Sequence, residues 1–222
     1  MWYSIAIFII YHLIIFHLYK VFYYYNIKPC MMLLVGLGGL GSLLAYYLRV
    51  LYKKWFVVLD KDIVDESNIK YHPFYNKKDL GEYKAKIVGN RLGLPYIISD
   101  IKDIDLSPYK IVIEALDNWR DRKYLIKKSK ELGFILIHTA VSEDKGELAI
   151  IKESHDYFLK FEGEGHARNY MPLIFSPIAA WFIDNYYQYF DKFVIFKDWE
   201  ITILNAKRVP NFKHNSNDSF GD

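Results

Sequence analysis

Short apolar runs alternate with segments whose apolar residues recur at helical spacing, from about residue 31 to residue 140. A strand buried on both faces is continuously apolar, whereas a surface helix is apolar every three or four residues. The predicted strands are the run before Gly36 and residues 55–59, 94–99, 110–116 and 133–138. The predicted helices are residues 40–52, 81–92 and 119–132. This rhythm predicts a Rossmann-like α/β fold, with a mostly parallel sheet covered by helices on both faces.

The remaining pattern is less regular. Residues 65–80 are polar and aromatic without a period, which predicts a long loop. Beyond residue 139 we expect a strand at 147–151, a charged loop at 152–170, an amphipathic helix at 173–190 and a C-terminal antiparallel hairpin at 192–196 and 199–204, turned by Lys197-Asp198. No linker is long enough to separate two domains. We therefore expect one domain, residues 29–210, between an apolar N-terminal helix, residues 1–28, and a disordered polar tail, residues 211–222.

The N-terminal stretch, residues 1–25, has two interpretations. Its first charged residue is Lys20, and its apolar length makes it a candidate membrane span. In that case Lys20 and Lys28 would place the rest of the chain on the cytoplasmic side. His12 and His17 fit less easily in lipid than in a protein interface, so a helix buried in the domain or between subunits is the alternative.

Four glycines follow the first predicted strand and open the first predicted helix, in the pattern Gly36-x-Gly38-Gly39-x-Gly41. Such a turn lets backbone N–H groups approach a phosphate, and the helix dipole favours its negative charge. Glycine turns also serve plain packing, but the flanking strand and helix are what nucleotide binding requires. We therefore predict a nucleotide-binding turn.

Asp60 ends the second predicted strand, roughly twenty residues beyond the glycines. In a Rossmann-type fold this position carries the acid that hydrogen-bonds a ribose hydroxyl. The alternative is a solvated carboxylate at a strand end. Ligands of such sheets bind at the carboxyl ends of strands, and Gly36, Asp60 and Asp117 all fall there.

Composition narrows the class of protein. The 222 residues are 52% hydrophobic and 25% charged, which indicates a globular chain. The net charge of +3 is small and dispersed, so no nucleic-acid partner is expected. Cys30 is the only cysteine, which excludes an internal disulfide and a CxxC zinc pair. A single cysteine suits a reducing compartment, so we expect the cytoplasm, with membrane association through the N-terminal helix left open.

Several short motifs occur in register. They are the glycine turn with its doubled Gly38-Gly39, DxDxV at 60–64, Ser67-Asn68, GxxKA at 81–85, and Asp117-Asn118 with Arg122 five residues after Asp117. Their order and spacing resemble the ubiquitin-activating-enzyme-like adenylyltransferases of the ThiF, MoeB and HesA family. The resemblance covers residues 31–140, and more loosely reaches residue 210. Each motif alone is common, but all of them in register are specific.

The resemblance implies ATP-dependent adenylation of the C-terminal carboxylate of a small ubiquitin-like or sulfur-carrier protein. Lys84 would neutralise the phosphates, Asp117 would bind Mg²⁺, and Asn68 would hydrogen-bond the nucleotide. From residue type alone, Lys84 is a solvated lysine and Asp117 a helix N-cap. The implied cofactors are ATP and Mg²⁺, without zinc, and the implied assembly is a homodimer or a heterodimer with another ThiF-like chain, with the apolar stretches 1–25 and 173–190 at its interface.

The sequence also departs from the family pattern. Tyr71 stands where the family usually has arginine, and no basic residue of 1–28 can be matched by motif. With Cys30 alone, the chain lacks the zinc cysteines and the cysteine that forms a thioester in some members. The alternative is therefore a non-catalytic partner subunit or scaffold that binds nucleotide weakly or not at all. A nicotinamide-dependent oxidoreductase is a third interpretation, although no substrate domain follows.

Overall fold

The computed structural model of the chain describes residues 31–71, 73–159 and 170–205. The described strands and helices belong to a compact unit that begins at Met32. The predicted helix at 1–28 and the tail at 211–222 lie outside the described residues, so both domain boundaries stay predictions. Among the described residues, no helix is long and apolar enough to cross a membrane.

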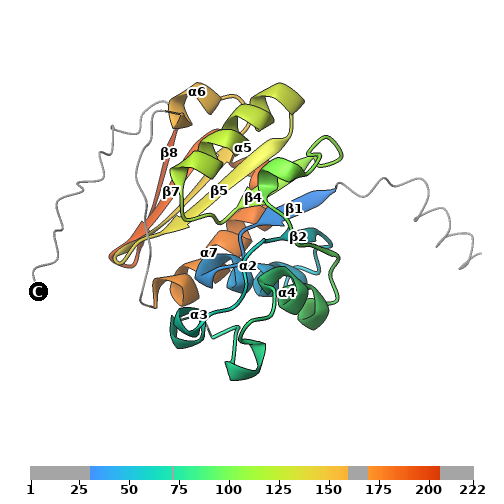
Figure 1. The fold of residues 1–222 in the computed structure, drawn as a ribbon. Coiled ribbons are helices and arrows are strands. Elements are labelled where there is room, and N and C mark those ends of the chain that lie inside the picture. Colours follow the sequence, from blue (N-terminus) through green and yellow to red (C-terminus); the bar gives the residue numbers. More distant parts are fainter. Residues whose placement is uncertain (1–30, 72, 160–169, 206–222) are drawn as a thin grey trace, which may run out of the picture. The chain divides into compact units, whose positions relative to one another are not determined.

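The described strands form one eight-stranded sheet in the order β3-β2-β1-β4-β5-β6-β7-β8. Their bounds are Met32–Val35 (β1), Val57–Leu59 (β2), Tyr96–Ile97 (β3), Ile111–Glu114 (β4), Ile135–Val141 (β5), Lys145–Ile151 (β6), Lys192–Lys197 (β7) and Glu200–Asn205 (β8). Pairing is parallel from β3 to β5 and antiparallel from β5 to β8. The parallel half, built by strand–helix alternation, confirms the predicted fold class (Figure 1).

The helices cover both faces of the sheet, as predicted (Figure 1). On one face lie α2 (Gly39–Val50), α4 (Lys84–Leu92) and α7 (Met171–Asp184), and on the other lies α5 (Trp119–Leu132). The short helices are α3 (Glu66–Tyr71), α6 (His155–Phe158) and the 3-10 turns η1 (Lys77–Asp79), η2 (Ile101–Asp103) and η3 (Tyr186–Gln188).

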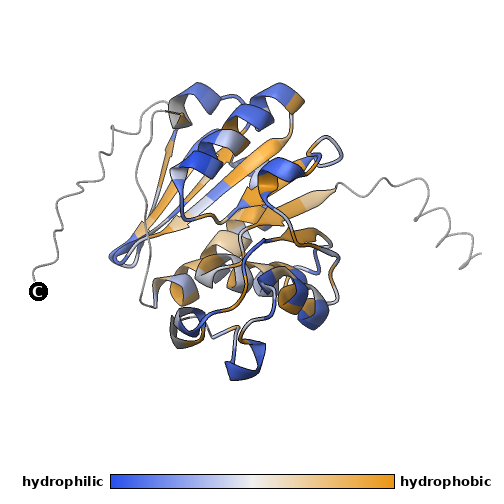
Figure 2. Ribbon diagram, viewed as in Figure 1, coloured by the Kyte–Doolittle hydropathy of each residue, from blue (hydrophilic) through white to orange (hydrophobic). Residues whose placement is uncertain are grey.

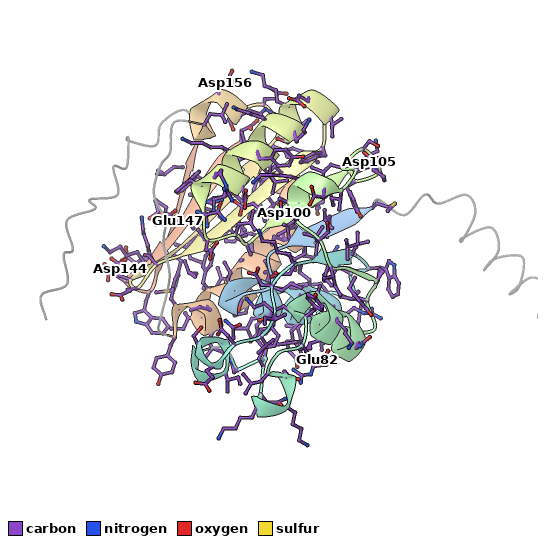
Figure 3. All side chains as sticks on the ribbon, in the orientation of Figure 1. Glu82, Asp100, Asp105, Asp144, Glu147 and Asp156 are labelled. Carbon is purple, nitrogen blue, oxygen red and sulfur yellow. The ribbon has the colours of Figure 1, made fainter. Side chains whose placement is uncertain are left out.

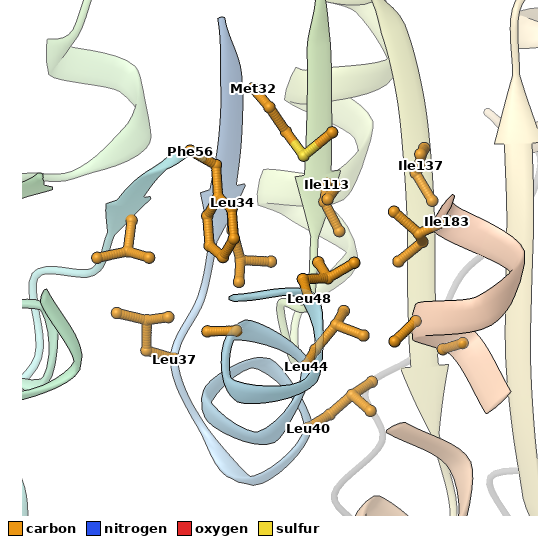
Figure 4. Close-up of a cluster of buried hydrophobic side chains, with 14 of the residues drawn as sticks. Met32, Leu34, Leu37, Leu40, Leu44, Leu48, Phe56, Ile113, Ile137 and Ile183 are labelled. Carbon is orange, nitrogen blue, oxygen red and sulfur yellow. The ribbon is translucent and has the colours of Figure 1, made fainter. Parts of the chain in front are cut away.

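The main core lies between the sheet and α2 (Figure 4). Leu40, Leu44 and Leu48 recur every fourth residue of α2, which places them on one helix face against the strands. Ile113 of β4 and Ile183 of α7 close the cluster. Figure 2 shows the corresponding pattern, with apolar strands inside and a polar outer face on α5. Burial of this face positions the start of α2, and with it the glycine turn.

Four expectations need correction. The predicted loop at 65–80 contains α3 and η1, and the charged loop at 152–170 contains α6. These helices span six residues or fewer, too few to show a period in the sequence. The predicted helix at 173–190 ends at Asp184 and continues only as η3. The hairpin turns at Asp198-Trp199, both with positive φ, and not at Lys197-Asp198, because Lys197 pairs with Glu200.

Candidate nucleotide-binding site

A cavity of about 710 Å³ opens at the carboxyl ends of β1, β2, β4 and β5. Seven of the eight predicted site residues line it: Gly36, Gly38, Gly39, Asp60, Asn68, Lys84 and Asp117. Gly41 does not line the cavity and lies behind the turn. Asp100, labelled in Figure 3, lines the cavity at the connection between β3 and β4. The parallel strand order thus brings together residues that are up to 81 positions apart.

The glycine turn is close-packed on its inner side and open toward the cavity. Gly36 has a φ of +86°, and its N–H donates to the Leu59 carbonyl at 2.9 Å. A Cβ on Gly41 would lie 1.9 Å from the Gly36 carbonyl oxygen, whereas a Cβ on Gly38 would meet nothing within 4 Å. Gly41 is therefore required for packing, and Gly38 leaves space beside the cavity.

This contrast predicts opposite outcomes for two alanine variants. Gly41→Ala should destabilise the fold by about 3 kcal/mol or more, because the added methyl group overpacks the turn. Gly38→Ala should melt close to wild type but bind ATP more weakly, since its methyl group enters the space where a phosphate would approach. Thermal unfolding and calorimetry of both variants check this. Equal melting temperatures for the two variants would contradict the packing argument.

Asp60 shapes the glycine turn. Its Oδ2 accepts a hydrogen bond from the Leu37 N–H at 2.7 Å, and its Oδ1 accepts one from the Asp62 N–H at 2.8 Å. The Tyr75 hydroxyl donates to the Leu37 carbonyl at 2.5 Å, so both polar backbone atoms of Leu37 are held. Burial raises the pKa of Asp60 above its usual value. A carboxylate has further lone pairs, so the ribose role stays a prediction beside this structural one.

Lys84 is buried and not a solvated surface lysine. It is the first residue of α4 and is 8% exposed. Its N–H donates to the Asp62 carbonyl at 2.9 Å, and its Nζ lies 3.7 Å from Asp62 Oδ2. Burial raises the pKa of Asp60, and the charge of Lys84 only partly offsets that rise. The Ser67 hydroxyl and, to a smaller extent, the charge of Lys84 lower the pKa of Asp65. The site therefore holds a cation that carboxylates surround.

Asn68 reaches the cavity from α3. Its side-chain Oδ1 accepts from the Asp65 N–H at 3.1 Å, and its own N–H donates to Asp65 Oδ1 at 2.9 Å. This reciprocal pair starts α3 in the segment that the sequence predicts as a loop. Asn68 is 7% exposed and lines the cavity, so its position is compatible with the predicted contact to nucleotide.

Asp117 lies between β4 and α5 and lines the cavity. The N-cap of α5 is Asn118, whose Oδ1 accepts from the Asp121 N–H at 2.9 Å. Asn118 Nδ2 also lies 3.3 Å from Asp117 Oδ1 and orients that carboxylate. The N-cap interpretation of Asp117 is therefore wrong.

No group of three or more histidine, cysteine or acidic side chains that could hold a metal ion occurs in the part of the chain that the structure describes. Mg²⁺ carried by ATP needs only one or two protein carboxylates, because phosphate oxygens and waters complete its shell. The carboxylate of Asp117, which lines the cavity, fits that requirement.

A model of the ThiF family matches residues 13–169, which is most of the chain. The chain belongs to the ThiF family. Among curated proteins, it is similar to a probable molybdopterin-synthase adenylyltransferase of Gracilaria tenuistipitata var. liui, with 31% identity over 137 residues, 56% of this chain and 38% of that protein. It is also similar to a sulfur carrier protein adenylyltransferase of Thermus thermophilus, with 27% identity over 136 residues, 56% of this chain and 50% of that protein. The chain thus spans half or less of the length of these relatives.

A crystal structure of selenomethionine PaaA has the same fold, with a TM-score of 0.62 and 13% identity. The likeness covers 81% of this chain and 73% of that one. At this identity it supports the α/β architecture alone.

Proposed function

We propose that this ThiF-family chain adenylates the C-terminal carboxylate of a small ubiquitin-like or sulfur-carrier protein, using ATP and Mg²⁺. The observation that carries the proposal is the single cavity in which the glycine turn, Lys84 and Asp117 meet at the carboxyl ends of parallel strands. The names of the two relatives support the same reaction class. No thioester on this chain is part of the proposal, since Cys30 is its only cysteine.

The reaction requires little acid–base catalysis from the protein. A carboxylate oxygen attacks the α-phosphorus of ATP, a P–O bond forms, and the bond to pyrophosphate breaks. A C-terminal carboxyl group has a pKa of about 3.5, so the nucleophile is already ionised at neutral pH and needs no general base. The work of the site is to place two anions together and to offset their charge. Lys84 supplies a fixed positive charge in the cavity, and Mg²⁺ when bound to Asp117 would offset charge on the phosphates.

The charge of the cavity favours a metal-bound nucleotide. Its lining includes six aspartates, Asp60, Asp62, Asp65, Asp100, Asp117 and Asp121, against four basic residues, Lys61, Lys84, Arg120 and Arg122. A free ATP polyanion would meet net negative charge there, whereas its Mg²⁺ complex carries less charge to repel. We therefore expect calorimetry to show ATP binding with Mg²⁺ that is much weaker in EDTA, and no comparable binding of NAD.

The deciding assay is pyrophosphate release from ATP. A purified sulfur-carrier protein with a free C-terminus is compared with the same protein amidated at its C-terminus. We expect release with the free carboxylate and none with the amide, because the amide lacks the nucleophile. Release that is independent of the carrier protein would be plain hydrolysis and would overturn the proposal.

The non-catalytic partner subunit is the second candidate, and Tyr71 favours it. A tyrosine cannot reproduce the two-pronged contact that an arginine makes with phosphate. Failure to bind Mg²⁺-ATP would select this candidate and direct attention to a second ThiF-like chain. Either candidate is proposed to act as a dimer in the cytoplasm, with α7 and the stretch 1–25 at the interface or, for 1–25, in a membrane.

A further inference from the structure

Glu114 and Arg122 form a buried ion pair beside the cavity, and no step of the proposed reaction uses it. Glu114 is the last residue of β4 and is 1% exposed. It lies opposite His138 of β5 in the parallel register, and its Oε1 contacts His138 Nδ1. Burial alone would raise the pKa of Glu114, but the charges of His138 and Arg122 outweigh it and lower the pKa below its usual value. Glu114 is therefore a buried carboxylate and not a neutral acid.

This carboxylate and Arg122 clamp the backbone next to Asp117. Glu114 Oε2 accepts from the Leu116 N–H at 3.1 Å, and Arg122 Nη2 donates to the Leu116 carbonyl. Arg122 Nε lies 3.5 Å from Glu114 Oε2. Both polar backbone atoms of Leu116 are thus held by the two ends of one ion pair, and Asp117 is the next residue along the chain.

His138 touches both ends of the segment that carries Asp117. At the beginning of the segment its Nδ1 holds Glu114. At its end, the ring of Trp119, the first residue of α5, stacks on the imidazole with centroids 5.7 Å apart and planes 29° apart. The Arg122 guanidinium in turn lies 5.1 Å from the centre of the Trp119 ring. His138 therefore contacts one residue on each side of Asp117.

We propose that His138 is a positioning residue for Asp117: through Glu114 and Trp119 it holds the carboxylate where nucleotide-bound Mg²⁺ is received. The inference rests on the proposed function, because it takes Asp117 as the Mg²⁺ ligand. Side chains that orient a metal ligand without touching the metal set its affinity, because a ligand free to turn away must be ordered each time the metal binds. The imidazole fits this task, since it is 4% exposed and enclosed between two elements.

The test measures the Mg²⁺ concentration at which ATP binding is half-maximal. His138→Leu removes the donor to Glu114, and its half-maximal Mg²⁺ concentration should rise about tenfold. His138→Asn places an amide nitrogen where Nδ1 stood, and it should stay within about twofold of wild type. His155→Leu is the matched control, because His155 is also buried, at 7% exposed, but lies on α6 and does not line the cavity. It should leave the Mg²⁺ requirement unchanged.

ATP binding in EDTA and thermal unfolding separate positioning from a loss of structure. If His138→Leu does not fold, His138→Gln replaces it, because the longer amide cannot occupy the Nδ1 position and should still raise the Mg²⁺ requirement. If every His138 variant has the Mg²⁺ requirement of the wild type and Asp117→Ala raises that requirement, the inference is overturned while the proposed function stands. A wild-type protein whose ATP binding ignores both Mg²⁺ and Asp117→Ala would overturn the proposed function, and with it this inference.

Discussion

Replacing Asp117 with alanine is expected to lower carboxylate-dependent pyrophosphate release by about a thousandfold, on the scale of the several kcal/mol that a bound metal ion contributes. Asp117 lines the cavity beside the glycine turn, where the phosphates would lie. The fold should survive, because Asn118 and not Asp117 caps α5. The measurement is the rate of pyrophosphate release at saturating ATP, together with the melting temperature.

Two further variants define what the loss means. Asp117→Asn keeps the size of the side chain and removes its charge, so a similar loss of rate shows that the charge matters. Asp103→Ala removes an exposed aspartate of η2 that does not line the cavity, and it should change the rate less than twofold. An Asp117→Ala protein that keeps Mg²⁺-dependent activity would show that Asp117 is not the Mg²⁺ ligand.

The part of this site that sequence predicts well is the part that local geometry determines. A strand, a glycine turn and a helix start within about ten residues of one another, so Gly36 and Gly41 can be placed without knowing the rest of the fold. Asp60 and Asp117 follow because each ends a buried strand, and parallel strands end at the same edge of a sheet. Seven of the eight residues line one cavity, while their roles stay predictions.

Contacts between strands do not follow from the spacing of residues in the sequence. Asp60 looks like a ligand-binding acid, yet both its oxygens accept backbone N–H groups, one of them from the residue 23 positions earlier. Glu114 and His138 each lie inside a predicted strand, and the sequence pattern assigns neither a role. A signal was present, since an acid and a histidine near the ends of two successive apolar runs become neighbours when the runs pair in parallel. Using it requires the strand order and the register, which spacing alone does not determine.

Replacing Lys84 with alanine should lower the same rate by between about a hundredfold and a thousandfold, as expected when one group that stabilises developing negative charge is removed. The ammonium group is buried among Asp60, Asp62 and Asp65, so its loss makes the cavity more negative as well as removing a phosphate contact. ATP binding should weaken together with the rate. Calorimetry with Mg²⁺-ATP and the pyrophosphate assay measure the two effects separately.

Lys86 provides a control on the same helix. It lies two residues further along α4, and its Nζ pairs with Glu82 at 2.7 Å. Neither residue lines the cavity, and Glu82 is labelled in Figure 3. An exposed pair of this kind contributes little to stability, so Lys86→Ala should retain ATP binding and rate. If both lysine variants lose activity equally, the general charge of α4 and not a specific cation is responsible. If only Lys84→Ala loses activity, the buried lysine is the cation of the reaction, because both variants remove the same charge from the same helix.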